Sequence, residues 1–138
     1  MVGILIVAHG TMGESMIQCV SHVMGGRPPQ LMQVGVSMHD DPQQALQQAL
    51  KLVKQLDQGD GVLVLSDIYG ATPCNIACRL LVPGKVEGVA GVSLPMLVRA
   101  LTYSSEPLAT VVEKALSGGQ EGVMRIPSEI RGYAAAGS

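Results

Sequence analysis

Short apolar runs alternate with helical patterns along the chain, and no other feature of the sequence limits the fold as strongly. The runs are rich in β-branched residues, as expected for strands covered on both faces, and they occupy residues 2–8, 31–36, 62–65 and 86–92. Apolar residues at three- and four-residue spacing predict helices across residues 16–24, 42–56, 72–81, 93–101 and 108–116. Such alternation is typical of a mostly parallel sheet with helices on both faces. We therefore expect an α/β, doubly wound fold whose central sheet has the strand order 2-1-3-4.

Capping signals and glycine pairs mark where the helices begin and end. Residues 40–42 read Asp-Asp-Pro, which is a typical helix start. The glycine pair at residues 118–119 is expected to end the last helix and to release a short fifth strand at residues 122–126. We expect a single domain at residues 1–126, followed by a C-terminal tail at residues 127–138 that is partly disordered.

The composition excludes several classes of function. Apolar residues make up 47% of the chain, yet it has no Trp, no Phe and only three Tyr, so we expect an aliphatic core. Proteins that bind single-stranded nucleic acid use aromatic side chains and a basic surface, whereas this chain has a formal net charge of −2. No apolar stretch approaches the roughly 20 residues of a membrane span, and no basic region precedes the first apolar run, as it would in a signal peptide. We therefore expect a cytoplasmic protein that binds no nucleic acid and is not embedded in a membrane.

The cysteines predict neither a disulfide framework nor a zinc site. Cys19, Cys74 and Cys78 are odd in number, lie inside expected helices and show no C-x-x-C spacing. We interpret them as small apolar residues in a reducing compartment. Because the chain has no cluster of metal-ligand residues, we expect no metal and no other cofactor.

Two of the expected strands end in residues that carry chemistry. His9 follows the first strand, and Asp67 follows the third. In doubly wound sheets the functional site lies outside the carboxyl ends of the strands, where the strand order reverses. If the first and third strands are neighbours, His9 and Asp67 meet there. A carboxylate that accepts the proton of one imidazole nitrogen fixes the tautomer and leaves the other nitrogen nucleophilic.

The stretch SDIYGATPCN, at residues 66–75, predicts an anion-binding turn beside these two residues. Gly70 allows a close backbone turn, Thr72 is expected to cap the next helix, and Pro73 suits the first turn because it lacks an N–H group. The backbone N–H groups of residues 70, 71, 72 and 74 would then be free to bind an anion. An imidazole, a carboxylate and an anion cradle in one crevice are suited to accept and donate a phosphoryl group.

Each of these residues also has a purely structural interpretation. A lone histidine at a strand end is more often a hydrogen-bonded structural residue, a strand-end aspartate is commonly a loop cap, and Thr-Pro is first of all a helix start. The joint position of His9, Asp67 and Thr72 at the expected crevice favours the functional interpretation. We expect His39 to belong to a helix cap, and His22 to be structural or exposed.

Over nearly its whole length, the chain resembles the A component (EIIA) of the mannose family of the bacterial phosphoenolpyruvate:sugar phosphotransferase system (PTS). The resemblance is carried by GILIVAHG at residues 3–10, GDGVLVLSDIYGATPCN at residues 59–75, GVSLPML at residues 91–97 and AL-S-GG-Q-EG at residues 115–122.

The resemblance implies a phosphotransferase that carries a phosphoryl group on a histidine. His9 would be the transiently phosphorylated residue, Asp67 would orient the His9 ring, and Thr72 would help to hold the phosphoryl group. The backbone contacts to this group would come from Gly10, Gly70 and Ala71.

The resemblance also implies partners. The phosphoryl group would come from the histidine carrier protein HPr and leave for a histidine of an EIIB component, for sugar uptake or its regulation. The chain would form a homodimer in which the strand at residues 122–126 is antiparallel and exchanged between the copies. It would associate with a membrane permease complex without being embedded in the membrane itself.

The chain departs from the family pattern in ways that leave alternatives open. Family members often have Gly-Gly-Ser-Pro where this chain has Gly-Ala-Thr-Pro, and Phe where it has Tyr69 and Cys74, although Thr72 keeps the hydroxyl. No B domain is expected after this one. Two alternatives follow: a regulatory dimer that is phosphorylated without a transport partner, and the related phosphocarrier of dihydroxyacetone kinase.

Three other classes of site do not match the sequence. A response-regulator receiver needs an acidic pair after the first strand to bind magnesium, where this chain has Ala8-His9-Gly10. A flavin or nucleotide site would need a glycine motif that HGTMGES does not provide. A serine hydrolase would need the G-x-S-x-G elbow, which the chain lacks.

Overall fold

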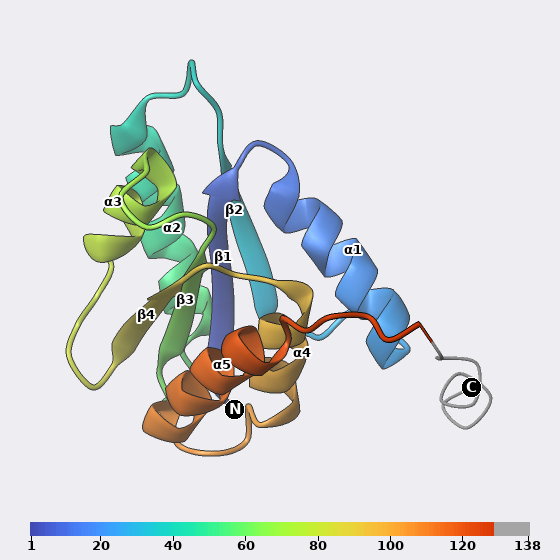
Figure 1. Cartoon of the computed structure of the whole chain (residues 1–138). Helices are drawn as coiled ribbons and strands as arrows, with labels where there is room; N and C mark the ends of the chain where they lie inside the picture. Colours follow the sequence, from blue (N-terminus) through green and yellow to red (C-terminus); the bar gives the residue numbers. More distant parts are fainter. Residues whose placement is uncertain (129–138) are drawn as a thin grey trace.

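Parallel strands form the centre of the fold, in a four-stranded sheet of order β2-β1-β3-β4 (Figure 1). The computed structural model describes residues 1–128. The strands are β1 (Gly3–His9), β2 (Leu31–Val36), β3 (Val62–Ser66) and β4 (Val86–Ala90). The helices are α1 (Met12–Met24), α2 (Pro42–Leu56), α3 (Thr72–Cys78), α4 (Leu94–Thr102) and α5 (Leu108–Glu121). The strand order and direction confirm the prediction from the sequence.

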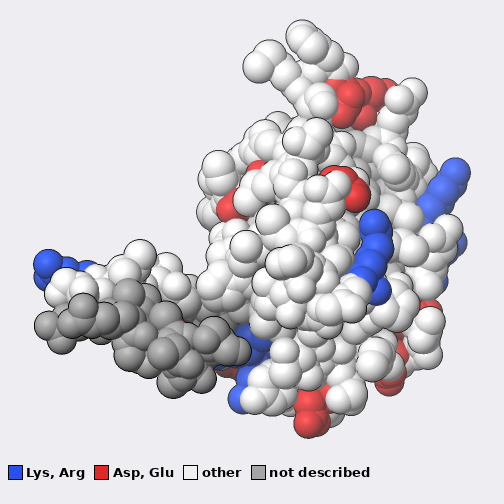
Figure 2. All heavy atoms as spheres, turned by 90° about the vertical axis from the view of Figure 1, so that its right-hand side faces the viewer, with Lys and Arg blue, Asp and Glu red and all other residues white. Residues whose placement is uncertain are grey.

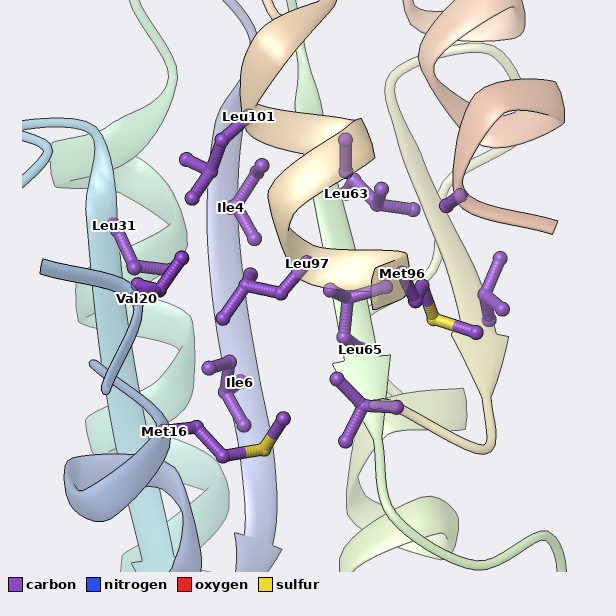
Figure 3. Close-up of a cluster of buried hydrophobic side chains, with 14 of the residues drawn as sticks. Ile4, Ile6, Met16, Val20, Leu31, Leu63, Leu65, Met96, Leu97 and Leu101 are labelled. Carbon is purple, nitrogen blue, oxygen red and sulfur yellow. The ribbon is translucent and has the colours of Figure 1, made fainter. Parts of the chain in front are cut away.

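Helices cover both faces of the sheet, as predicted. Helices α1, α4 and α5 pack on one face, and α2 and α3 pack on the other (Figure 1). Strands β1 and β3 lie in the middle of the sheet and are buried on both faces, which explains why their sequences are continuously apolar. Figure 3 shows the aliphatic core between the sheet and α1 and α4, where Ile4, Ile6, Val20, Leu63 and Leu97 are buried together.

Local capping signals set three of the helix ends that the sequence predicted: the start of α2, the end of α1 and the start of α4. The Asp41 side chain caps α2 by accepting a hydrogen bond from the N–H of Gln43, and Pro42 is the first residue of that helix. Helix α1 ends at Gly25, which has a left-handed backbone (φ 78°). Ser93 caps α4 by accepting from the N–H of Met96.

The glycine pair at residues 118–119 does not end the last helix, so this prediction was wrong. Helix α5 continues through both glycines to Glu121. A Cβ at Gly118 would lie about 3.0 Å from atoms of Pro95 and Arg99 in α4. The glycine therefore lets two helices pack closely instead of turning the chain.

The predicted fifth strand is also not found within the described residues. Residues 123–127 form neither helix nor strand, and they run along the outside of the molecule in Figure 1. A strand needs a hydrogen-bonding neighbour, and this segment has none within residues 1–128. The proposed exchange between two copies stays a prediction, and most of the tail at 127–138 lies outside the described residues.

The three cysteines, which the sequence analysis interpreted as small apolar residues, differ in their exposure. Cys74 is buried, but Cys19 and Cys78 are exposed, and all three are free thiols. The helical spacing does not distinguish the edge of an apolar face from its centre, so the sequence did not predict which of the cysteines is buried.

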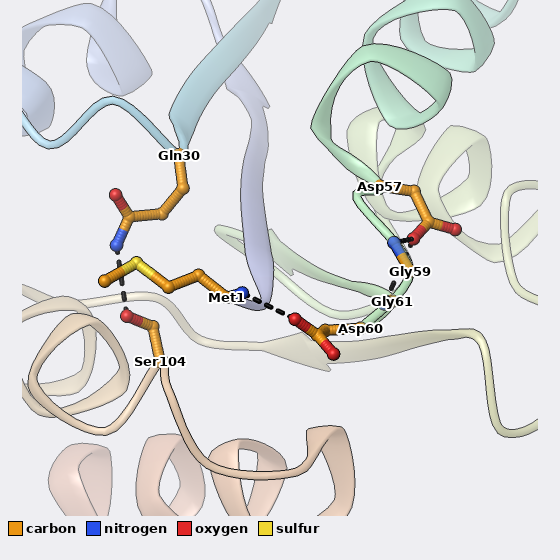
Figure 4. A network of polar contacts seen from close by, with 7 residues as sticks. All are labelled: Met1, Gln30, Asp57, Gly59, Asp60, Gly61 and Ser104. Carbon is orange, nitrogen blue, oxygen red and sulfur yellow. Dashed lines mark hydrogen bonds and ion pairs between the residues drawn. The ribbon is translucent and has the colours of Figure 1, made fainter.

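Loop contacts close the end of the sheet where the strands begin (Figure 4). Asp57 accepts hydrogen bonds from the N–H groups of Gly59 and Gly61, and the amino group of Met1 lies 2.5 Å from Asp60. Gln30 donates to the hydroxyl of Ser104 at 3.0 Å.

No helix in the described part of the chain is long and apolar enough to span a lipid bilayer.

Candidate functional site

His9 and Asp67 lie in contact at the carboxyl ends of two neighbouring strands. His9 is the last residue of β1, Asp67 directly follows β3, and these strands pair in parallel. The Nδ1 atom of His9 lies 2.6 Å from Oδ2 of Asp67, and the same oxygen accepts the backbone N–H of His9 at 2.9 Å. The structure brings together the two residues that the sequence predicted to meet.

The Asp67 carboxylate is held in its charged form by its hydrogen bonds. Its side chain is 5% exposed, and this burial by itself raises the pKa of Asp67. The backbone N–H and the ring of His9, together with the N–H of Ile68, outweigh burial and hold the pKa below its ordinary value of 3.8. A charged Asp67 favours a proton on Nδ1 of His9 and leaves Nε2 as the nitrogen that can react. The His9 side chain is 53% exposed, so a reactant can reach it.

A crevice next to the His9 ring is built from three parts of the chain. It is lined by the end of β1, the segment from the end of β2 to the start of α2, and the start of α3, with the residues His9, Val36, Ser37, Met38, Asp40, Pro42, Thr72 and Pro73. The predicted residue Thr72 therefore faces the same crevice as His9. Thr72 does not cap α3, contrary to the prediction: the capping position is Ala71, and Thr72 is the first helical residue. Its hydroxyl forms no hydrogen bond within residues 1–128, so it is available to a ligand.

The backbone N–H groups predicted to bind a phosphoryl group differ in their availability. Gly70 has a left-handed backbone (φ 87°), as its turn requires, and its N–H is unused within the described residues. By contrast, the N–H of Ala71 donates to the carbonyl of Ile68 at 3.3 Å, so the prediction that it is free was wrong. The N–H of Gly10 donates to the carbonyl of Val36 at 2.9 Å. The roles of Gly10 and Ala71 in binding a phosphoryl group stay predictions. To bind that group, each N–H would have to give up the hydrogen bond that it makes here to Val36 or Ile68.

Sequence reasoning missed Gly35, which supports the turn after His9. Gly10 has a left-handed backbone (φ 52°), and a Cβ at residue 35 would lie less than 3.0 Å from the Gly10 carbonyl oxygen. The absence of a side chain at Gly35 thus lets the turn after His9 pack onto β2. A glycine inside an otherwise apolar strand often marks such a close approach, and this was the available signal.

The other two histidines lie apart from this chemistry. His39 is exposed in the turn before α2, and Asp41 rather than His39 caps that helix, so its predicted place in the cap was wrong. His22 is exposed on α1, which agrees with one of its two expected interpretations. In the described part of the chain, no three His, Cys, Asp or Glu side chains lie together in a way that could hold a metal ion.

Comparison with known proteins identifies the family. The sequence model described as EIIA-man, PTS system fructose IIA component, matches residues 3–116. The chain belongs to this family. It is similar to the PTS system mannose-specific EIIAB component of Escherichia coli K12, with 26% identity over 131 residues. That alignment covers 93% of this chain and 40% of the relative, so the chain spans less than half of the EIIAB protein.

Solved structures of other EIIA proteins have the same fold. The phosphotransferase system component EIIA of Streptococcus agalactiae superposes with a TM-score of 0.80 at 22% identity, covering 91% of this chain and 97% of that one. The mannose/sorbose specific IIA subunit of Enterococcus faecalis superposes with a TM-score of 0.81 at 23% identity, covering 91% and 95%. At these identities, the likeness shows that this EIIA-family chain shares their doubly wound α/β fold.

Proposed function

We propose that this EIIA-family chain is a phosphocarrier that accepts a phosphoryl group on His9 from phosphorylated HPr. It passes the group to a histidine of an EIIB component, for sugar uptake or its regulation. The observation that carries the proposal is the contact between Nδ1 of His9 and the buried carboxylate of Asp67. This contact leaves Nε2 of a half-exposed imidazole free to act as a nucleophile.

In the proposed step, Nε2 of His9 attacks the phosphorus atom in line with the donor nitrogen. The bond between phosphorus and the donor imidazole breaks as the new N–P bond forms, and its electron pair returns to the donor ring. Because both partners are imidazoles, the exchange is nearly balanced in energy, and positioning does most of the work. The proton on Nδ1 stays hydrogen-bonded to Asp67, whose charge stabilises the positive ring. The hydroxyl of Thr72 and the N–H of Gly70 donate to the phosphoryl oxygens.

The proposal includes the assembly and the location of the carrier. The domain at residues 1–126 forms a homodimer by exchanging residues 122–126, with the tail at 127–138 outside it. It works in the cytoplasm beside a membrane permease complex. The exposed apolar side chains of Val123, Met124 and Ile126 support this assembly, because a partner copy would cover them.

Intact-mass measurement tests the proposed phosphorylation. The chain is mixed with phosphoenolpyruvate, enzyme I and HPr, in parallel with a His9→Ala variant. We expect the mass of one phosphoryl group on the wild type, lost in acid and missing from the variant. The controls are phosphorylation of HPr in the same mixture and a His22→Ala variant, which should accept the group normally because His22 is exposed on α1. Phosphorylation of His9→Ala at another residue, or none on the wild type, contradicts the proposal.

A further inference from the structure

A second cavity lies on the far side of α3 from the His9 crevice, between this helix and the strands β3 and β4 (Figure 1). Its volume is about 150 Å³. The residues that matter for its chemistry are Val64, Ser66, Cys74, Cys78, Leu81 and Gly88, and we call this cavity the α3 pocket. It shares no lining residue with the crevice that holds His9, so the two are separate sites.

Small residues leave the α3 pocket open. Ala77 lines it from α3, and Gly88 lines it from β4. A Cβ at Gly88 would lie 3.1 Å from the Leu81 side chain, so a larger residue in β4 would take up part of this space. A dry cavity of this size can hold a molecule about as large as benzene. Tyr69 and Cys78 belong to the same lining and are exposed, so a ligand can enter from solvent.

The wall of the α3 pocket contains a buried hydroxyl without a partner. Ser66 is the last residue of β3 and is 2% exposed, and its hydroxyl makes no hydrogen bond within residues 1–128. Alternate residues of a strand face the same side of a sheet, and Val62 and Val64 pack toward α2 and α3. The Ser66 hydroxyl therefore faces α3, where the pocket lies. An unpaired buried hydroxyl costs free energy, so a ligand that pairs with it binds more favourably.

The rest of the lining is apolar and uncharged. No Asp, Glu, Lys or Arg of the described chain lines the pocket, whereas acidic side chains lie on the part that protrudes at the top of the molecule (Figure 2). The thiols of Cys74 and Cys78 stand one helical turn apart on α3 and both line the pocket. Sulfur is polarizable and makes favourable contacts with aromatic rings. The pocket therefore suits a neutral ring that carries a single polar group.

We propose that the α3 pocket binds a small neutral phenol, with its ring against the apolar side chains and the thiols and its hydroxyl paired with that of Ser66. A hydroxyl can both donate and accept, so it pairs with Ser66 in either direction. A phenol loses its proton only near pH 10, at about the pKa of tyrosine, and so brings no charge into the pocket at neutral pH.

Two ligands of nearly equal shape test the proposal. Phenol and toluene, which has a methyl group in place of the hydroxyl, are titrated at millimolar concentration into the wild type and Ser66→Ala. Dissociation constants are measured by NMR from the methyl shifts of Val64 and Leu81, which line the pocket. We expect the ratio of the toluene Kd to the phenol Kd to fall about fivefold in Ser66→Ala. This comparison between two proteins cancels the different hydration of the two ligands. An unchanged ratio shows that Ser66 does not pair with the phenol and overturns the proposal.

A cavity-filling variant tests where the ligands bind. Family members often have Phe where this chain has Cys74, so Cys74→Phe should keep its far-ultraviolet circular dichroism and bind neither ligand. The matched control is Cys19→Phe, because Cys19 is exposed on α1, and it should bind both ligands as the wild type does.

Three results contradict a site in the α3 pocket. The first is that neither ligand shifts the methyl groups of Val64 and Leu81 in the wild type. The second is an equal shift at Val20 and Leu97, which lie on the other face of the sheet. The third is a folded Cys74→Phe that binds both ligands normally. If Cys74→Phe does not fold, the Kd ratio in Ser66→Ala decides, because removing an unpaired hydroxyl breaks no hydrogen bond within residues 1–128.

Discussion

At the scale of single residues, the contact between His9 and Asp67 determines what this EIIA-family site can do. One carboxylate oxygen holds both the ring and the backbone N–H of His9, so the imidazole is fixed in direction and in tautomer. Thr72 shares the crevice, but its hydroxyl forms no hydrogen bond with the ring in this structure. The two side chains should therefore contribute unequally.

We predict that Asp67→Ala slows phosphorylation of His9 by about 100-fold, because the reacting ring loses its orientation and its stabilising charge. Thr72→Ala should slow it by about tenfold, because one of several donors to the phosphoryl oxygens is lost. Single-turnover kinetics with phosphorylated HPr measure both rates. The prediction that Asp67 contributes more than Thr72 is contradicted if Thr72→Ala slows phosphorylation of His9 more than Asp67→Ala does.

The pH dependence of stability provides a second prediction at this scale. The pKa of Asp67 lies below its ordinary value of 3.8 in the folded chain, so folding favours the charged carboxylate. Its contribution to stability is therefore complete above about pH 4 and is lost as pH falls through the lowered pKa. The free energy of unfolding of the wild type and Asp67→Asn, measured from neutral pH into acid, should differ most near neutrality and converge in acid. A difference that stays constant over this range would exclude the carboxylate charge as its source.

At the scale of elements, the position of His9 depends on how the end of β1 packs between β2 and β3. Asp67 holds it from the side of β3, and the carbonyl of Val36 accepts the N–H of Gly10 from the side of β2. Gly35 makes the second contact possible, because any side chain there would displace the Gly10 carbonyl.

We predict that Gly35→Ala moves the turn after His9, destabilises the fold by about 1–3 kcal/mol and slows phosphorylation by phosphoramidate. The matched control is Gly88→Ala in β4, where the new Cβ would meet the flexible end of Leu81 at 3.1 Å. Chemical denaturation, the ring-nitrogen NMR shifts of His9 and the rate with phosphoramidate should all change more in Gly35→Ala. Unchanged His9 shifts and rate in Gly35→Ala would show that the contact does not position the histidine.

At the scale of the whole molecule, the last described segment is not part of the core of its own chain. Residues 121–128 are all exposed, and three of their side chains are large and apolar. Strand β4 lies at the edge of the sheet, so its outer edge can accept another strand. These features agree with the proposed exchange between two copies.

We predict that a chain ending at Gly122 folds as a monomer, whereas the full chain is a dimer. The truncated chain should keep its far-ultraviolet circular dichroism, because residues 123–128 are all exposed and belong to no helix or strand. Light scattering after size-exclusion chromatography measures the mass of each. Equal oligomeric states for the two chains would contradict the exchange.

Local sequence signals were enough to predict the four strands of the sheet, the five helices and the strand ends at which His9 and Asp67 lie. Continuous apolar runs, the caps at Asp41 and Ser93 and the stop at Gly25 act through neighbouring residues, so their effect can be predicted without a fold. Strand and helix alternation then places the ends of β1 and β3 at one edge of the sheet, which was enough to bring His9 and Asp67 together.

The groups that surround His9 and Asp67 are set by contacts between elements that lie far apart in the sequence. Gly118 lies inside α5 because α4 packs against it, and Gly35 is needed because the Gly10 carbonyl packs against it. Met38 and His9 are far apart in the sequence. They line the same crevice because β1 and β2 are neighbouring strands. The physical reason is the same in each case: the role of such a residue depends on contacts between elements distant in sequence, and local patterns carry no information about them.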